Sequence, residues 1–213
     1  FPNHIPNPEN ARAMESLVQA VQKHNADFGL IFDTDVDRVG AVDKGGVVVN
    51  KNRLIAVISA ILLRETPGAT IVTDSITSTG LAQFIKAHGG KHHRFKRGYK
   101  NVINEAISLN RQGCYTPLAI ETSGHAALKE NYFLDDGAYL AIRLLIEVAR
   151  LHQNNQGISD LLSSLAEPEE SIEFRLPIRR DDFVSYGQSL ISRLTEYAEK
   201  NPAFALVPNN YEG

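Results

Sequence analysis

The feature that most constrains the fold is an alternation of short apolar runs with helical patterns across residues 54–151. Residues 54–63 form an apolar run long enough for a buried helix. The other elements predicted in this stretch are helices at 80–88, 102–109 and 136–151, and strands at 69–73 and 117–121. Strands that alternate with helices connect in parallel. The sequence therefore predicts an α/β fold, with a mixed, largely parallel sheet covered by helices on both faces.

Shorter segments flank this stretch on both sides. The patterns before it predict a helix at 10–25, a strand at 28–32, and a hairpin of 39–42 with 47–49 around the turn sequence DKGG. The patterns after it predict a short helix at 158–165, a strand at 172–177 and a helix at 183–200. The last two segments together are too small to bury a core of their own. A chain of 213 residues fits one complete domain with partial neighbours.

Composition excludes several classes of partner. The chain of 213 residues has a net charge of -3 and no long basic run, so neither nucleic acid nor an anionic membrane surface is expected as a partner. No apolar run reaches the ~18 residues of a membrane span. The single cysteine, Cys114, cannot form an internal disulfide and favours a reducing compartment, so we expect a cytoplasmic protein.

Three carboxylates follow the predicted strand at 28–32, in the sequence DTDVDR. Asp33, Asp35 and Asp37 stand at alternate positions, where their mutual repulsion becomes affinity if they share a hard divalent cation such as Mg²⁺. A solvated acidic turn and an aspartate nucleophile at Asp33 are the alternatives. An EF-hand is excluded, because Arg38 and Lys44 stand where that loop needs glycine and glutamate.

A second group of polar residues follows the predicted strand at 117–121, in the sequence ETSGH. Gly124 allows a tight turn that brings Glu121, Ser123 and His125 into one space. A carboxylate and a hydroxyl can hold sugar hydroxyls, and an imidazole can act as acid or base near neutral pH. A histidine that only bonds a neighbouring carbonyl is the alternative for His125.

A basic cluster precedes the predicted helix at 102–109, in the sequence HHRFKRGYKNV. Arg94, Lys96, Arg97 and Lys100 surround Gly98, and the amino end of a helix also favours anions. The cluster therefore predicts a phosphate site, with a solvated basic surface as the alternative.

These three stretches, in this order, resemble the phosphohexomutase superfamily of phosphoglucomutases and phosphomannomutases. DTDVDR resembles the family's metal loop, KRGYKNV its lysine-bearing loop and ETSGH its sugar-recognition loop, and FPNHIPNPE is similar to a segment before the metal loop. The resemblance implies a four-domain enzyme that moves a phosphoryl group between the 1 and 6 positions of a hexose phosphate. A phosphoserine, a bisphosphate intermediate and Mg²⁺ take part in that reaction.

The resemblance also implies roles for individual residues. Asp33, Asp35 and Asp37 would bind Mg²⁺, and Arg38 would lie beside the phosphoserine. Glu121, Ser123 and Gly124 would bind the sugar. The residues implied in proton transfer or phosphate binding are His125, Arg97 and one of Lys96 and Lys100, with His4 as a further site candidate.

By the same resemblance, residues 1–46 would be the end of domain 2, residues 47–166 a complete domain 3, and residues 167–213 the truncated start of domain 4. The phosphoserine loop of such enzymes has no counterpart here, so the chain alone is expected to be inactive and to need the missing domains. Thr34 and Val36 stand where the family has small residues, and either would be strained at a positive φ. The alternatives are a mutase for an amino sugar or N-acetylhexosamine phosphate, and a catalytically dead homologue that binds sugar phosphate.

Overall fold

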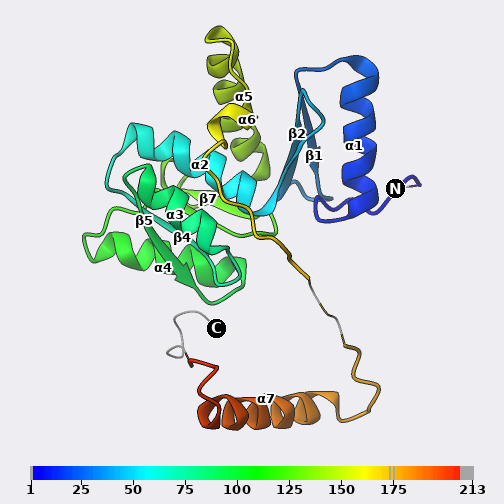
Figure 1. Ribbon diagram of the computed structural model, residues 1–213, viewed down its shortest axis with the longest axis vertical. Helices are drawn as coiled ribbons and strands as arrows, with labels where there is room; N and C mark the ends of the chain where they lie inside the picture. The colour runs from blue at the N-terminus through cyan, green and yellow to red at the C-terminus, as the bar shows by residue number, and fades with distance from the viewer. Residues whose placement is uncertain (1, 173, 175, 207–213) are drawn as a thin grey trace.

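The computed structural model describes residues 2–172, 174 and 176–206 of the chain. A small N-terminal unit lies beside a larger α/β unit, and an extended segment leads from the α/β unit to a C-terminal helix (Figure 1).

The N-terminal unit is a helix packed on an antiparallel sheet of order β1-β2-β3. Its elements are α1 (Ala11–His24), β1 (Phe28–Phe32), β2 (Val39–Asp43) and β3 (Val48–Val49). The helix begins where the Asn10 side chain accepts the N–H of Ala13. Met14 and Val21 of α1 pack with Val42 of β2, which fixes the helix on one face of the sheet. The predicted helix and hairpin are both present.

The α/β unit contains the remaining strands. Its elements are α2 (Lys51–Glu65), β4 (Thr70–Asp74), α3 (Thr79–Ala87), β5 (Lys91–Phe95), α4 (Tyr99–Arg111), β6 (Leu118–Ile120), β7 (Ala126–Leu128), the 3₁₀ turn η1 (Lys129–Asn131), α5 (Gly137–Gln153) and α6 (Ile158–Leu161). The strand order is β5-β4-β6-β7. β4 is parallel to β5 and to β6, and β7 is antiparallel to β6.

Helices cover both faces of this sheet, as predicted. On one face, Ile71 and Leu118 belong to the core that includes α2 and α3. On the other face, Val72 and Ala119 pack against Val102 of α4. Adjacent residues of a strand point to opposite faces, so this alternation is expected of a sheet buried on both sides.

The helix α2 forms the centre of the core. Every residue from Leu54 to Leu63 is buried, because α3, α5 and α6 surround the helix. A fully buried large aliphatic side chain contributes roughly 1.5–3 kcal/mol. The predicted buried helix at 54–63 is therefore confirmed.

Three details differ from the sequence-based expectations. The strands β5 and β7 were not predicted. The strand β5 reads KHHRF and lies at the sheet edge, where polar residues are tolerated. The strand β7 has only three residues, too few to show a pattern. The helix predicted at 158–165 ends at Leu161. The strand predicted at 172–177 is wrong for its described residues, which pair with no other strand, and residues 173 and 175 lie outside the described part.

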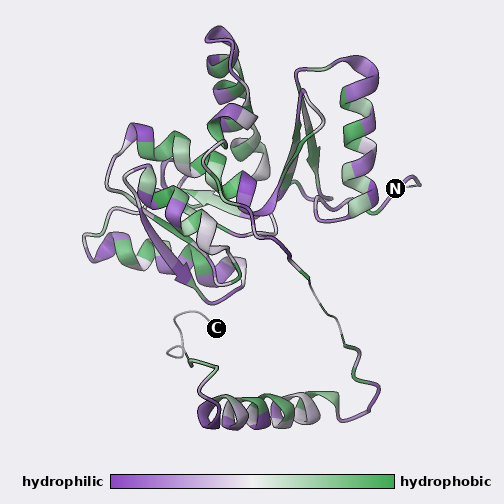
Figure 2. Ribbon diagram, in the orientation of Figure 1, coloured by the Kyte–Doolittle hydropathy of each residue, from purple (hydrophilic) through white to green (hydrophobic). Residues whose placement is uncertain are grey.

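The helix α7 (Phe183–Lys200) confirms the prediction at 183–200. All of its residues are described, and none is buried. Leu190, Ile191 and Leu194 are among its exposed apolar residues, and Figure 2 shows green apolar segments along the helix. Its amphipathic pattern is therefore present without a packing partner among the described residues.

Candidate functional site

The acidic loop leaves the end of β1 and passes over the amino end of α5. The N–H of Gly137, the first residue of α5, donates to the carbonyl of Val36 at 3.0 Å. A Cβ at position 137 would come within 2.8 Å of that carbonyl, so only glycine fits there. The amino end of α5 therefore lies directly against the acidic loop, where its dipole favours negative charge.

Val36 has a φ of 65°, and Thr34 is not among the described residues with positive φ. The expected strain therefore falls on Val36 alone. A β-branched residue is rare in this left-handed region, since its side chain crowds the backbone.

Asp33 is the buried member of the loop. Its Oδ1 accepts the N–H of Arg38 at 3.1 Å, and its Oδ2 accepts Nε of Arg38 at 2.8 Å. Burial alone would raise the pKa of Asp33, but these hydrogen bonds hold it below the ordinary value. Nη1 of Arg38 also lies 3.4 Å from Oδ1 of Asn7, so the N-terminal segment helps to orient the arginine.

The three aspartates fit a divalent cation. One carboxylate oxygen from each of Asp33, Asp35 and Asp37 lies within 4.8 Å of the others. Oδ1 of Asp37 is buried, and it accepts no hydrogen bond from the described residues. Burial raises the pKa of Asp37, and the charge of Asp33 raises it further. Nε of Arg38 lies 3.7 Å from this oxygen, too far for a hydrogen bond, and a hard cation would supply a closer partner.

The loop with Ser123 and His125 lies beside the acidic loop. His125 forms an antiparallel bridge with Arg38. Gly124 has a φ of 100°, and a Cβ at this position would lie only 3.0 Å from the carbonyl oxygen of Val39. This close approach again requires glycine. The bridge joins two segments that the sequence predicted separately.

Asp135 holds the imidazole of His125. Its Oδ2 lies 2.8 Å from Nδ1 of His125, and its Oδ1 accepts the N–H of Ala126 at 3.1 Å. Asp37 lies on the same side, with Oδ2 3.6 Å from Nδ1. Burial lowers the pKa of His125, but the Asp135 hydrogen bond and the two negative charges outweigh it and raise the pKa above the ordinary value.

Glu121 joins this loop to the basic cluster. Its Oε1 accepts the N–H of Gly98 at 2.6 Å, and its Oε2 accepts Oγ of Ser123 at 3.2 Å. The ring of Tyr99 stacks on His125, with centroids 4.8 Å apart. Burial raises the pKa of Glu121. The three predicted loops therefore meet at one place.

The other predicted residues lie at differing positions. Arg97 and Lys100 are exposed around the amino end of α4, and Lys96 is half-buried with its ammonium 5.8 Å from the Phe95 ring. His4 makes a local contact, with Nδ1 3.1 Å from the carbonyl of Ile5.

Sequence reasoning missed Asp135, Tyr99 and Asp74 at this site. The repeated aspartate in LDDGAY was a usable signal for the first, because Asp136 caps α5 through the N–H of Tyr139 and leaves Asp135 available for another role. Asp74 and Tyr99 gave no such signal.

A cavity of about 320 Å³ lies away from this site, between the β2–β3 turn and α5. Three of its charged wall residues are already bonded: Lys44 to Asp27 at 3.2 Å, and Asp43 to the hydroxyl of Ser159. We therefore locate the candidate chemistry at the meeting point of the three loops and not at this cavity.

Family models match most of the chain. The model for phosphoglucomutase/phosphomannomutase, alpha/beta/alpha domain III, matches residues 50–168. The model for domain II of the same family matches residues 1–46.

Curated relatives carry related names. A phosphoglucomutase from Neisseria meningitidis is 32% identical over 97% of this chain and 43% of its own length. A phosphomannomutase/phosphoglucomutase from Pseudomonas syringae is 35% identical over 81% of this chain and 37% of its own length. The chain thus spans less than half the length of these relatives.

Solved structures have the same fold. A phosphoglucomutase/phosphomannomutase family protein from Burkholderia thailandensis matches with a TM-score of 0.67 and 33% identity, over 78% of this chain and 35% of that one. A Thermus thermophilus structure described as a phosphomannomutase is 20% identical with a TM-score of 0.62, over 75% of this chain and 35% of that one, which supports the fold alone.

Proposed function

The chain belongs to the phosphoglucomutase/phosphomannomutase family, and we propose that it forms the metal-binding and sugar-recognition parts of a phosphohexomutase. The whole enzyme would move a phosphoryl group between the 1 and 6 positions of glucose or mannose phosphate, through a phosphoserine and a bisphosphate intermediate. The observation that carries this proposal is the meeting of the acidic, sugar and basic loops through Arg38–His125 and Gly98–Glu121.

In this proposal, Asp33, Asp35 and Asp37 hold Mg²⁺. When bound, Mg²⁺ neutralises charge on the phosphoryl group in transfer. Arg38 is held by Asp33 and Asn7, so its guanidinium has a fixed position beside the phosphoserine. Oδ1 of Asp37, which is buried and accepts no hydrogen bond from the described residues, supports the assignment of the cation.

The sugar loop would bind and deprotonate hydroxyl groups. Each carboxylate oxygen of Glu121 has a second lone pair, which can accept a sugar hydroxyl beside the bond that the structure shows. Because Asp135 holds Nδ1 of His125, Nε2 is the nitrogen that exchanges a proton with the sugar. Arg97 and either Lys96 or Lys100 would bind the phosphate that is not in transfer.

The test measures conversion of glucose 1-phosphate to glucose 6-phosphate by the full-length protein that carries this chain. We expect turnover that depends on Mg²⁺, and a loss of about 100-fold or more in kcat/KM for Asp33→Asn. Asp27→Asn, an exposed acid paired with Lys44, is the matched control and should keep full activity. Absence of turnover in the unmodified protein would refute the proposal.

The purified 213-residue chain is expected to show no turnover, because the phosphoserine would come from another part of the enzyme. Conversion by this chain, free of contaminating mutase, would contradict that part of the proposal. Rates on glucose, mannose, glucosamine and N-acetylglucosamine phosphates would separate the hexose mutase from its amino sugar alternatives.

One observation favours a second candidate, a sugar phosphate-binding protein without catalysis. Val36 holds a strained backbone in the middle of the acidic loop, and strain there could displace the metal ligands. A full-length protein that binds hexose phosphate but carries no phosphoserine and shows no turnover would support this candidate.

A phosphatase with Asp33 as its nucleophile is tested by the Asp33→Asn variant introduced above. If the Asp33→Asn protein still forms a phosphoserine, the phosphatase is excluded.

A further inference from the structure

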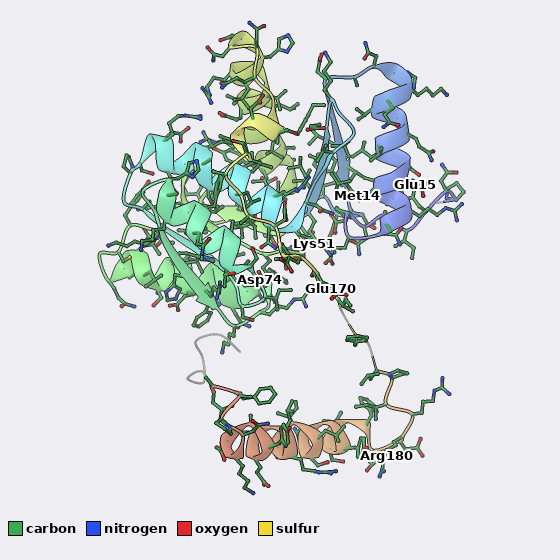
Figure 3. All side chains as sticks on the ribbon, viewed as in Figure 1. Met14, Glu15, Lys51, Asp74, Glu170 and Arg180 are labelled. Atoms are coloured by element: carbon green, nitrogen blue, oxygen red, sulfur yellow. The ribbon has the colours of Figure 1, made fainter. Side chains whose placement is uncertain are left out.

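Asp74 is a fully buried carboxylate at the carboxyl end of β4 (Figure 3). Its Oδ2 accepts the hydroxyl of Thr122 at 2.6 Å, and its Oδ1 accepts the N–H of Thr122 at 3.3 Å. Thr122 is also buried. One carboxylate therefore holds both the backbone and the side chain of a single residue.

The strand end that carries Asp74 is itself fixed. The carbonyl of Asp74 accepts the hydroxyl of Thr73 at 3.1 Å and that of Thr77 at 3.2 Å. The two hydroxyls lie 3.2 Å apart, and Thr73 also contacts Nε2 of His92 at 2.7 Å. The carboxylate is therefore presented to Thr122 from a rigid platform.

Thr122 stands between Glu121 and Ser123, the two residues proposed to hold sugar hydroxyls. The turn that follows is closed by bonds from the Gly124 N–H to the Glu121 carbonyl and from the Glu121 N–H to the His125 carbonyl. The position of Thr122 thus sets where both neighbouring side chains point.

Burial of a carboxylate costs free energy, so a carboxylate that is retained in the core is expected to have a specific role. We propose that Asp74 is a positioning residue of the sugar-recognition loop, which sets the orientation of Glu121 and Ser123 through Thr122. This inference rests on the proposed function, and Asp74 itself touches no substrate.

The experiment uses the full-length protein and measures KM and kcat for glucose 1-phosphate. Thr122→Val removes the hydroxyl while it keeps the side-chain shape, and Asp74→Asn removes the charge. We expect each to raise KM about tenfold or more with a smaller change in kcat. Thr122→Ser keeps the hydroxyl and should stay within about threefold of the unmodified protein.

Thr116→Val is the matched control. Thr116 is also buried and donates its hydroxyl to the carbonyl of Cys114, at the opposite end of the sheet. A merely structural role for Asp74 would lower the thermal midpoint of Thr122→Val and Thr116→Val alike and leave KM unchanged where both are folded.

The variants also report on the loop directly. Amide hydrogen exchange of the 213-residue chain should be faster at Glu121 and Gly124 in Thr122→Val and unchanged there in Thr116→Val. An active protein whose variants keep both KM and amide protection would overturn the role of Asp74 and leave the proposed function standing. An unmodified protein without turnover would overturn both.

Discussion

Carboxylates are buried in two regions of this molecule, and the two regions compensate their charge differently. At the α2–α5 seam, formed by Arg64, Glu147 and Arg150, the glutamate receives paired hydrogen bonds from both arginines at 2.6–3.0 Å. Burial alone would raise the pKa of Glu147, but the arginine hydrogen bonds lower it to about 2. The seam is a closed ion cluster that joins two helices.

The loop face, formed by residues 33–38, Asp74 and residues 121–125, is closed only at Asp33, which Arg38 binds and holds at a lowered pKa. Burial is the largest influence on the pKa of Asp37, Asp74 and Glu121, and it raises all three. A buried carboxylate whose pKa is raised lowers the stability of the folded chain at neutral pH. A fold that retains several of them therefore needs a reason other than stability. Under the proposed function, a bound cation and a polar ligand would provide that reason for the loop face and not for the seam.

The largest expected effect tests the seam. Glu147→Gln should lower the free energy of unfolding by about 3 kcal/mol, because it leaves two arginines without their buried counter-charge. Loss of one partner from a buried ion pair costs roughly 3–5 kcal/mol. We expect the lower end of this range, because both arginine side chains are 41% exposed and can turn to solvent. Urea denaturation of the 213-residue chain measures the change.

Glu65→Gln is the matched control for this change. Glu65 pairs with Arg143 across the same two helices, but its side chain is 43% exposed. A cost below about 1 kcal/mol is expected, because Glu65 is exposed and Arg143 keeps a second carboxylate, Glu130, at 3.4 Å. Equal losses of unfolding free energy in both variants would show that burial of Glu147 does not strengthen its ion pairs.

The next effect tests the loop face. Asp35→Asn should weaken Mg²⁺ binding about tenfold or more, since it removes one ligand, a loss of at least about 1.4 kcal/mol. Stability without Mg²⁺ should not fall, because Asp35 is exposed and its removal relieves repulsion. Titration calorimetry with MgCl₂ measures the affinity, and unchanged binding would remove Asp35 from the metal site.

The pH dependence of stability should differ in sign between Glu147 of the seam and Asp74 of the loop face. The pKa of Glu147 is lower in the folded state than its ordinary 4.5, so its contribution is complete above 4.5 and declines as pH falls toward 2. The deficit of Glu147→Gln should therefore shrink by roughly 1 kcal/mol between pH 7 and pH 4.

Asp74 should behave in the opposite way. Its pKa is higher when folded, through burial, so protonation favours the folded state as pH falls through the folded pKa toward the ordinary value of 3.8. Asp74→Asn should therefore become less stable relative to the unmodified chain on acidification. The same direction for both variants, in denaturation series from pH 7 to pH 4, would break the comparison.

The two regions were also unequally predictable from the sequence. The helices of the seam follow from local pattern, since the apolar run at 54–63 and the period of α5 each specify a helix with a buried face. The acidic, sugar and basic loops were found as motifs because each lies within a few residues. Their closeness in space was implied only by the family resemblance, and the structure shows it directly.

What the sequence did not predict depends on contacts between distant segments. Asp74 and Thr122 are 48 residues apart, and no local pattern marks them as partners. The strand β5 has the polar sequence KHHRF, so only its pairing with β4 identifies it. The strand expected at 172–177 shows the converse, because β propensity without a neighbouring strand did not suffice over its described residues.

The smallest effect tests the strain at Val36. At a φ of 65°, a β-branched residue costs about 1–2 kcal/mol relative to glycine, and glycine loses roughly 0.5–1 kcal/mol of chain entropy on folding. Val36→Gly should therefore raise the free energy of unfolding by about 0.5 kcal/mol. Val47→Gly is the matched control: Val47 is 37% exposed against 40% for Val36 and is not among the positive-φ residues, so its replacement should destabilise. If both variants lose stability equally, the loop face stores no backbone strain and differs from the seam in its charges alone.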